Sequence, residues 1–477
     1  MRVQLFGVGT LSESRAITAE KRINCQVEVR REMDRTSHAL TSRAGLASFV
    51  SSLGINPSRG MWAVNTLSTS LMFSVHANTL YSINASGTTS IIGNIGSSTG
   101  DVSMADDGKF LVLVDGTHGY AYNMLAPAGL TVITDGNFTN SPRTVTWQDN
   151  YFIVTSKATR QFQLSQISPS VDPTVWPAVQ IGFAAAGAGS LQNAIAYHNV
   201  LNLFGNNYSE FWQDTGSPDM PYALITGSAQ EYGLVAPFSA CPFDNSIVGL
   251  FNSREGGLNV SRISGFSLKK ISDHDLDEIL ADYSVVSDAQ GVSYNFGGHP
   301  CYILNLPTAQ ATWMYDGYAN TWSELRSGGG RYWGTKSAFF NGNTYISDFN
   351  NGNIYKLDSN NFTDNGSLIS MEIWSKHIWN DDKFIGIKQL QIDIESGVGL
   401  VSGQGVNPVC DLQVSKDGGA SFFSVGFSSM GAIGAFTQRL KWNNLGAARD
   451  WVLKLVITDP IKRVITGASA EITGAGF

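Results

Sequence analysis

The sequence LMFSVHANTLYSIN at residues 71–84 contains the pattern that decides the fold. An apolar strand meets a short polar turn, and the returning strand ends on an aromatic residue followed closely by Asp or Asn. Clear copies lie at residues 110–123 (FLVLVDGTHGYAYN), 199–214, 301–316 and 343–358, with two looser ones at 151–168 and 246–265. Their starts are about 40 to 55 residues apart, close to the length of a four-stranded propeller blade. Because a lone hairpin cannot bury its apolar face, we predict that the hairpins stack radially as propeller blades.

The predicted fold is all-β, a six- or seven-bladed β-propeller with an additional C-terminal β-sandwich. At 477 residues the chain is too long for one ordinary core. Residues 1–60 show strand-like alternation at 2–6 and 23–29, and we expect these strands to close the last blade and to contact partners. Residues 61–366 carry the repeats. In residues 367–477 the hairpin repeat gives way to strands with long connections, among them the apolar run WVLKLVI at 451–457. This pattern favours a separate sandwich over a final propeller blade with insertions.

One helix is expected within the repeats, at ISDHDLDEILADY (residues 271–283). Its apolar side chains fall on one face, and Ser272 with Asp275 resembles a capping box. This pattern is typical of a surface helix that closes a connection between blades.

Charge is scarce and uneven. Charged residues make up 15% of the chain, and the formal net charge is −8. Residues 1–50 carry eight cations against five anions, whereas the remainder carries 23 against 34. The acidic body argues against gripping of phosphates, but it is compatible with a channel through which double-stranded DNA passes without adhering. So few charges also favour a surface partly covered by partners, although large β proteins can be poor in charge on their own.

Compartment signals are few. Cys25, Cys241, Cys301 and Cys410 are scattered without metal-finger spacing, so reduced thiols are expected. The first 15 residues lack the pattern of a secretory signal, and no apolar run reaches the length of a membrane span. We therefore expect a soluble protein that is made in the cytoplasm.

Motifs of catalysis are weak. Residues 415–422 (SKDGGASF) match the aspartate box of sialidase-like propellers, a turn element that lies away from active sites. The G-x-S-x-G match at residues 96–100 is not followed by a helical pattern, and residues 315–322 resemble one kelch hairpin without the recurring double glycine. His274 lies among acidic residues that answer a helix dipole better than they form a metal site. We predict no catalytic, cofactor-binding or metal-binding residue, and no enzyme.

The order of the motifs resembles the packaged-DNA stabilisation proteins of short-tailed bacteriophages, also called tail hub or nozzle proteins. The resemblance starts with INCQ at residues 23–26 and SRAGLASF at 42–49. It continues through RGMW at 59–62, NTLY at 78–81, DVSMAD at 101–106, LVDG at 113–116 and GYAYN at 119–123. Residues 263–283 and the later MYD and TW complete it. Ala44 replaces the family's proline, and Cys25-Gln26 its usual Leu-Tyr.

This resemblance implies a structural virion protein without catalytic residues. It would form a homohexameric ring below the head-to-tail adaptor, extend the DNA channel, help retain packaged DNA and seat a tail needle or tail fibres. DNA would pass without sequence recognition, and the chain, made in the host cytoplasm, would end in the virion tail.

Two alternatives stay open. A propeller tail protein that binds or cleaves glycans is suggested by the aspartate box and the many aromatic residues. A kelch-like or WD40-like interaction hub is weakened by the absence of those repeat signatures.

Overall fold

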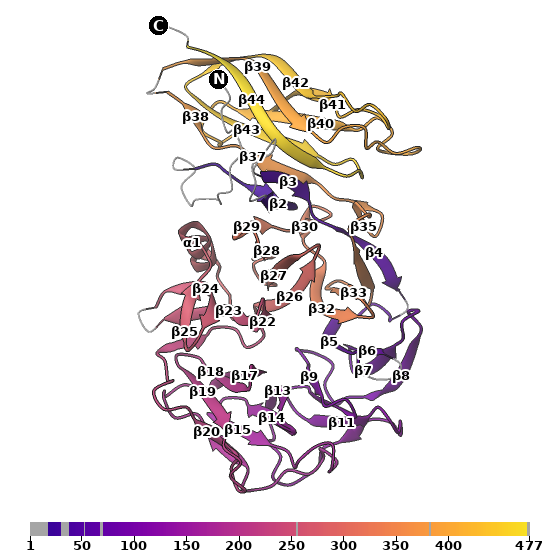
Figure 1. Cartoon of the computed structure of the whole chain (residues 1–477), viewed down its shortest axis with the longest axis vertical. Helices are drawn as coiled ribbons and strands as arrows, with labels where there is room; N and C mark the ends of the chain where they lie inside the picture. The colour runs from indigo at the N-terminus through magenta and orange to yellow at the C-terminus, as the bar shows by residue number, and fades with distance from the viewer. Residues whose placement is uncertain are drawn as a thin grey trace.

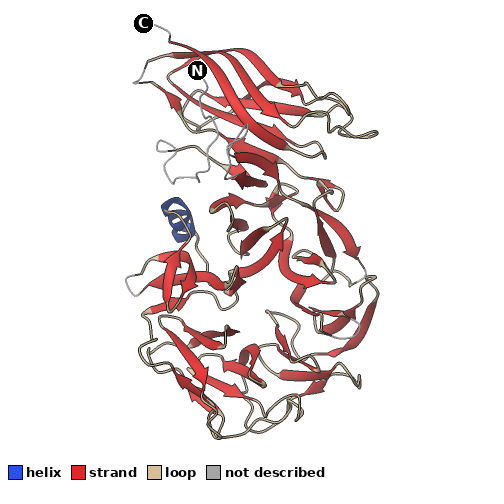
Figure 2. Ribbon diagram, viewed as in Figure 1, coloured by secondary structure: helices blue, strands red, loops and turns tan. Residues whose placement is uncertain are grey.

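The computed structural model describes residues 18–29, 38–51, 53–66, 70–253, 256–380 and 383–474. A ring of β-sheets lies beside a second β domain (Figures 1 and 2). The predicted all-β class, with a propeller and a C-terminal sandwich, is confirmed, and the ring has seven blades. No helix in the described ranges is long and apolar enough to cross a membrane.

Each blade is a sheet of antiparallel strands, and in most blades the first strand lies toward the axis. Blades one and two contain β5 (Ser58–Val64), β6 (Leu71–His76), β7 (Thr79–Ile83), β8 (Thr89–Asn94), β9 (Ser103–Asp106), β10 (Phe110–Val114), β11 (Gly119–Asn123) and β12 (Thr131–Val132). Blades three and four contain β13 (Pro142–Gln148), β14 (Tyr151–Ser156), β15 (Gln161–Leu164), β16 (Ile181–Phe183), β17 (Leu191–Tyr197), β18 (Val200–Gly205), β19 (Ser209–Asp214) and β20 (Tyr222–Leu224).

Blades five to seven vary this plan. In blade five, β21 (Tyr232–Leu234) and β22 (Cys241–Phe243) both pair with β23 (Ser246–Ser253), followed by β24 (Leu258–Ser264) and β25 (Ser267–Lys270). Blade six contains β26 (Gln290–Phe296), β27 (His299–Leu306), β28 (Ala311–Asp316) and β29 (Thr321–Glu324). Blade seven contains β32 (Gly334–Phe340), β33 (Asn343–Asp348) and β34 (Ile354–Asp358), preceded by the small hairpin β30 (Arg326–Ser327) and β31 (Gly330–Arg331).

The apolar runs of the repeats are explained by contacts on both faces of a blade. All five residues of β10 are buried. Leu111 and Leu113 pack in a core shared with blade one, whereas Val112 and Val114 pack in a core shared with blade three. Each such side chain contributes about 1.5–3 kcal/mol by leaving water. Because each blade stacks between two neighbours, the second strand of a blade is apolar on both of its faces.

The recurring Asp or Asn caps the turn that follows the third strand of a blade. Asp316 Oδ1 accepts hydrogen bonds from the backbone N–H groups of Tyr318 (2.9 Å) and Ala319 (3.2 Å). The same kind of bond is made by Asn84, Asn123, Asp214 and Asp358. These short side chains satisfy turn amides that no strand can reach.

Helix α1 (His274–Asp282) forms where it was predicted, and it buries Leu276 and Leu280. Its cap differs from the prediction. Asp273, not Ser272, accepts the hydrogen bond from the Leu276 amide at 2.9 Å.

The ring is closed by β4 (Gly45–Val50), which pairs antiparallel with β34 as the fourth strand of blade seven. Residues 23–29 do not close the ring. They lie in β1 (Arg22–Ile23), which pairs with both blade six and the sandwich, and in β2 (Cys25–Val29), which joins the sandwich, and the strand predicted at 2–6 lies outside the described residues. Gly45 fits at the closing position because a Cβ there would lie 2.5 Å from the Asn361 carbonyl oxygen.

The sandwich contains two sheets around one core. One sheet contains β37 (Met371–Trp374), β38 (Ile378–Trp379), β43 (Asp450–Ile457), β40 (Val409–Ser415) and β41 (Phe423–Ser429). The other contains β2, β3 (His38–Ser42), β44 (Val464–Gly474), β39 (Ile385–Ile394) and β42 (Leu440–Ala448). Trp451, Leu453 and Leu455 of the predicted apolar strand lie in the shared core.

A continuous sheet joins the two domains. Strand β1 pairs parallel with β29 of blade six and antiparallel with β37 of the sandwich. Blade seven also extends past β4 through β35 (Thr363–Asp364) and β36 (Ser367–Leu368). The N-terminal segment is therefore shared by propeller and sandwich.

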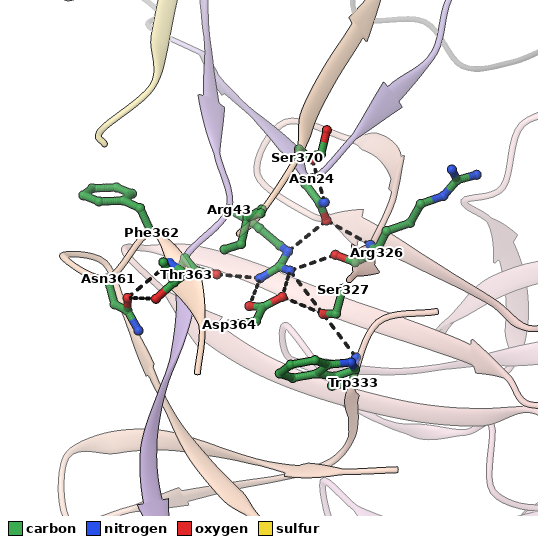
Figure 3. Close-up of polar contacts among 12 residues, drawn as sticks. Asn24, Arg43, Arg326, Ser327, Trp333, Asn361, Phe362, Thr363, Asp364 and Ser370 are labelled. Carbon is green, nitrogen blue, oxygen red and sulfur yellow. Dashed lines mark hydrogen bonds and ion pairs between the residues drawn. The ribbon is translucent and has the colours of Figure 1, made fainter. Parts of the chain in front are cut away.

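A buried guanidinium fixes this junction (Figure 3). Arg43 donates to Asp364 Oδ1 at 2.9 Å and Oδ2 at 2.5 Å, and also to the Arg326 carbonyl and Asn24 Oδ1. Ser327 donates to the same carboxylate at 2.6 Å. Because both charged groups are almost fully buried, their hydrogen bonds must replace the water they lost.

We expect Arg43→Ala to lower the free energy of unfolding by about 3–5 kcal/mol, since it leaves Asp364 buried without a cation. Denaturant unfolding followed by tryptophan fluorescence measures this loss. The control, Lys388→Ala, removes an exposed ion pair with Glu471 and should cost at most about 1 kcal/mol. Equal effects of the two substitutions would contradict the assigned role of Arg43.

A second prediction concerns pH. His299 Nδ1 lies 2.7 Å from Asp316 Oδ2, and this hydrogen bond raises the pKa of His299 above its ordinary 6.5. A raised pKa in the folded state stabilises the protein below pH 6.5, and the contribution is lost as the pH rises through the folded value. Urea unfolding between pH 5.5 and 9 should therefore show a fall in stability that His299→Gln lacks. Parallel pH profiles of the two proteins would refute this coupling.

Candidate functional site

The axis of the propeller encloses a cavity of about 570 Å³. It is lined by the innermost strands β5, β9, β13, β17, β22, β26 and β32. This volume is typical of small-ligand pockets, which hold about 300–1,000 Å³. A DNA duplex, whose major groove alone is about 12 Å wide, cannot pass through such a space. The axis of one propeller is therefore not a DNA conduit.

A neutralised charge cluster lies at one end of the axis, where the innermost strands begin. Lys336 Nζ lies 2.5 Å from Asp101 Oδ1, and Gln290 Nε2 donates to the same oxygen at 2.9 Å. These side chains come from blades seven, two and six, and all three lie at or near the starts of innermost strands. The cluster ties distant blades together and leaves little net charge at this end.

The opposite end has an aromatic mouth. Trp62 of β5 and Trp147 of β13 are each 36% exposed, toward the ends of their strands, and Asp106 ends β9 between them. The Trp62 indole N–H donates to Asp106 Oδ2 at 2.6 Å, and burial raises the pKa of Asp106. No sequence motif marks this mouth. The signal that the sequence offered for this mouth is that both tryptophans lie near the end of the innermost strand of their blade.

The aspartate box is a turn of the sandwich, between β40 and β41. Asp417 accepts from the Ser415 hydroxyl at 2.6 Å and from the amides of Ala420 and Ser421, and these bonds, the Ser415 one above all, lower the pKa of Asp417. The carboxylate is thus engaged in holding its own hairpin.

The serine motif at residues 96–100 is a loop held by Arg59. The Arg59 guanidinium donates to the carbonyls of Ser97, Thr99 and Gly100 at 2.5–2.7 Å. Ser98 itself is exposed.

The glycine-rich tract at residues 183–189 begins at the end of β16 and leads toward β17.

The histidines and cysteines do not gather into a metal centre. His274 Nε2 lies 2.9 Å from Glu278 Oε1 on the surface of α1. Burial raises the pKa of the Cys25 and Cys241 thiols to about 12, which keeps them protonated. Across the residues that the structure describes, no group of three or more His, Cys, Asp or Glu side chains could hold a metal ion.

Solved structures resemble this chain at low identity. The WD40 β-propeller domain of Doa1 is 10% identical with a TM-score of 0.42, and the match covers 66% of this chain and 98% of that one. The N-terminal domain of Nup159 is 8% identical with a TM-score of 0.37, covering 69% and 97%. No curated protein matches significantly.

Family models match both domains. Residues 10–362 match the model described as bacteriophage P22 Gp10, β-propeller, and residues 370–473 match the one described as bacteriophage P22 Gp10, β-sandwich. Together the matches cover nearly the whole chain, in the order in which the structure places the two folds. The chain therefore belongs to the P22 Gp10 family of phage tail nozzle, or DNA-stabilisation, proteins.

Proposed function

We propose that this phage tail structural protein forms a hexameric nozzle below the head-to-tail adaptor, where it extends the DNA channel and helps retain packaged DNA. The match of both domains to the Gp10 family carries this proposal. The narrow propeller axis supports a ring, because a conduit for a duplex then has to run between copies of the chain.

The rims of the blades offer surfaces for such a ring. The outermost strands β8, β12, β16 and β20 of four successive blades expose Ile91, Val132, Phe183 and Leu224. Sheet edges with exposed apolar side chains tend to pair or pack with other chains. We infer that these rims contribute to contacts between copies.

Charge distribution supports the remaining partners. The body is acidic, so a conduit lined by it would repel phosphates rather than bind them. The first 50 residues, which carry a net positive charge, would contact an acidic partner. The nozzle would meet the adaptor at one end and a tail needle or tail fibres at the other. The protein would be made in the host cytoplasm and end in the virion. A glycan-cleaving role gains no support from the aspartate box, whose carboxylate holds a turn.

The oligomer provides the first test. Native mass measurement of the chain with its adaptor should give a complex with six copies of the 51.4 kDa chain. Ile91→Glu and Phe183→Glu should weaken assembly because they bury a charge at the rim, whereas Ser90→Glu on the same strand as Ile91 serves as the exposed control. A protein that stays monomeric with the adaptor present would count against the proposal.

DNA binding provides the second test. We expect the isolated chain to bind duplex DNA no more tightly than about 10⁻⁴ M at physiological salt, the weak end of non-specific binding, because its net charge is −8. Fluorescence anisotropy with a labelled duplex between 50 and 200 mM salt measures this. Tight binding with a steep salt dependence would instead indicate a phosphate-gripping surface.

A further inference from the structure

Asp106 is a carboxylate without a cation, at the aromatic mouth of the axial cavity. Its oxygens accept from the Trp62 indole N–H at 2.6 Å and from the Gly108 amide at 3.0 Å. No ion pair joins it to a Lys, Arg or His of the described residues, and the like charge of the neighbouring Asp107 repels it. Neutral donors alone therefore balance a partly desolvated charge.

The other end of the axis shows how this chain satisfies a similar group. There Lys336 pairs with Asp101 and also lies 5.8 Å from the centre of the Phe238 ring. A cation between a carboxylate and an aromatic ring gains from both, since the ring face carries negative charge. The Asp106 mouth has the carboxylate and two half-exposed indoles but lacks the cation.

We propose that the Asp106 mouth binds an arginine or lysine side chain presented by a loop of a partner protein. The cation would lie against the Trp62 and Trp147 indoles and pair with Asp106. The Trp147 indole N–H makes no hydrogen bond within the described residues, so it is free to donate to a carbonyl of the same loop.

The volume of the cavity and the net charge of the chain favour a basic loop as the occupant. A cavity of about 570 Å³ admits a few side chains of a loop but not a duplex or a folded domain. A net charge of −8 favours the approach of a basic segment. This site does not depend on the hexamer, because all of its residues belong to one copy.

Fluorine NMR of the full chain labelled with 5-fluorotryptophan tests the site. The probes are acetyl-Gly-Arg-Gly-amide and acetyl-Gly-Lys-Gly-amide, with acetyl-Gly-Gln-Gly-amide as the neutral match and maltose as a sugar. We expect the cationic peptides to shift the signals of Trp62 and Trp147, identified with the single Leu variants, and to leave the other tryptophan signals in place.

Two variants then separate charge from bulk. Asp106→Asn keeps an acceptor for Trp62 and Trp147→Leu keeps an apolar side chain, and each should weaken peptide binding about tenfold. Asp219→Asn, which neutralises an exposed carboxylate on a loop of blade four, should bind like the parent. Thermal unfolding confirms that all variants are folded.

Three results would overturn the proposal. Equal shifts with the neutral peptide would remove the role of charge, and unchanged binding by Asp106→Asn would remove the role of that carboxylate. Shifts caused by maltose and not by the cationic peptides would assign the mouth to a sugar.

Discussion

One buried guanidinium holds four separate stretches of the chain together. Arg43 follows β3 of the sandwich and precedes β4 of blade seven, and it binds Asp364, the exit of blade six at Arg326, and Asn24. Asn24 in turn donates to the Ser370 carbonyl, where the sandwich begins. Ring closure and domain docking therefore share one set of hydrogen bonds. Because the charges are buried, the set is satisfied only when all four stretches are in place.

The hairpins were predictable because each carries its own local signals. The run FLVLV and the Asp or Asn at the turn specify strand and turn without reference to distant residues. The closing strand was harder to identify. GLASFV at β4 has no stronger alternation than residues 23–29, and the choice between them depends on the Asn361 carbonyl against Gly45 and on β37 beside β1. Those neighbours lie more than 300 residues away in sequence.

The aromatic mouth likewise depends on residues that are distant from one another in sequence. Trp62, Asp106 and Trp147 belong to three successive innermost strands, and each is unremarkable in its own repeat. Only the radial arrangement brings them to one end of the axis. By contrast, the aspartate box could be interpreted from sequence alone, because every partner of Asp417 lies within four residues of it.

The narrow axis of the propeller constrains the nozzle proposed above. The axial cavity holds about 570 Å³, so in the proposed ring the surface that lines the DNA channel would be an outer surface, shared with neighbouring copies. Such a ring would require each copy to hold its sandwich at a fixed angle, because a ring multiplies any error in its subunits. The sheet that runs from blade six through β1 into the sandwich meets this requirement with backbone hydrogen bonds rather than a flexible linker.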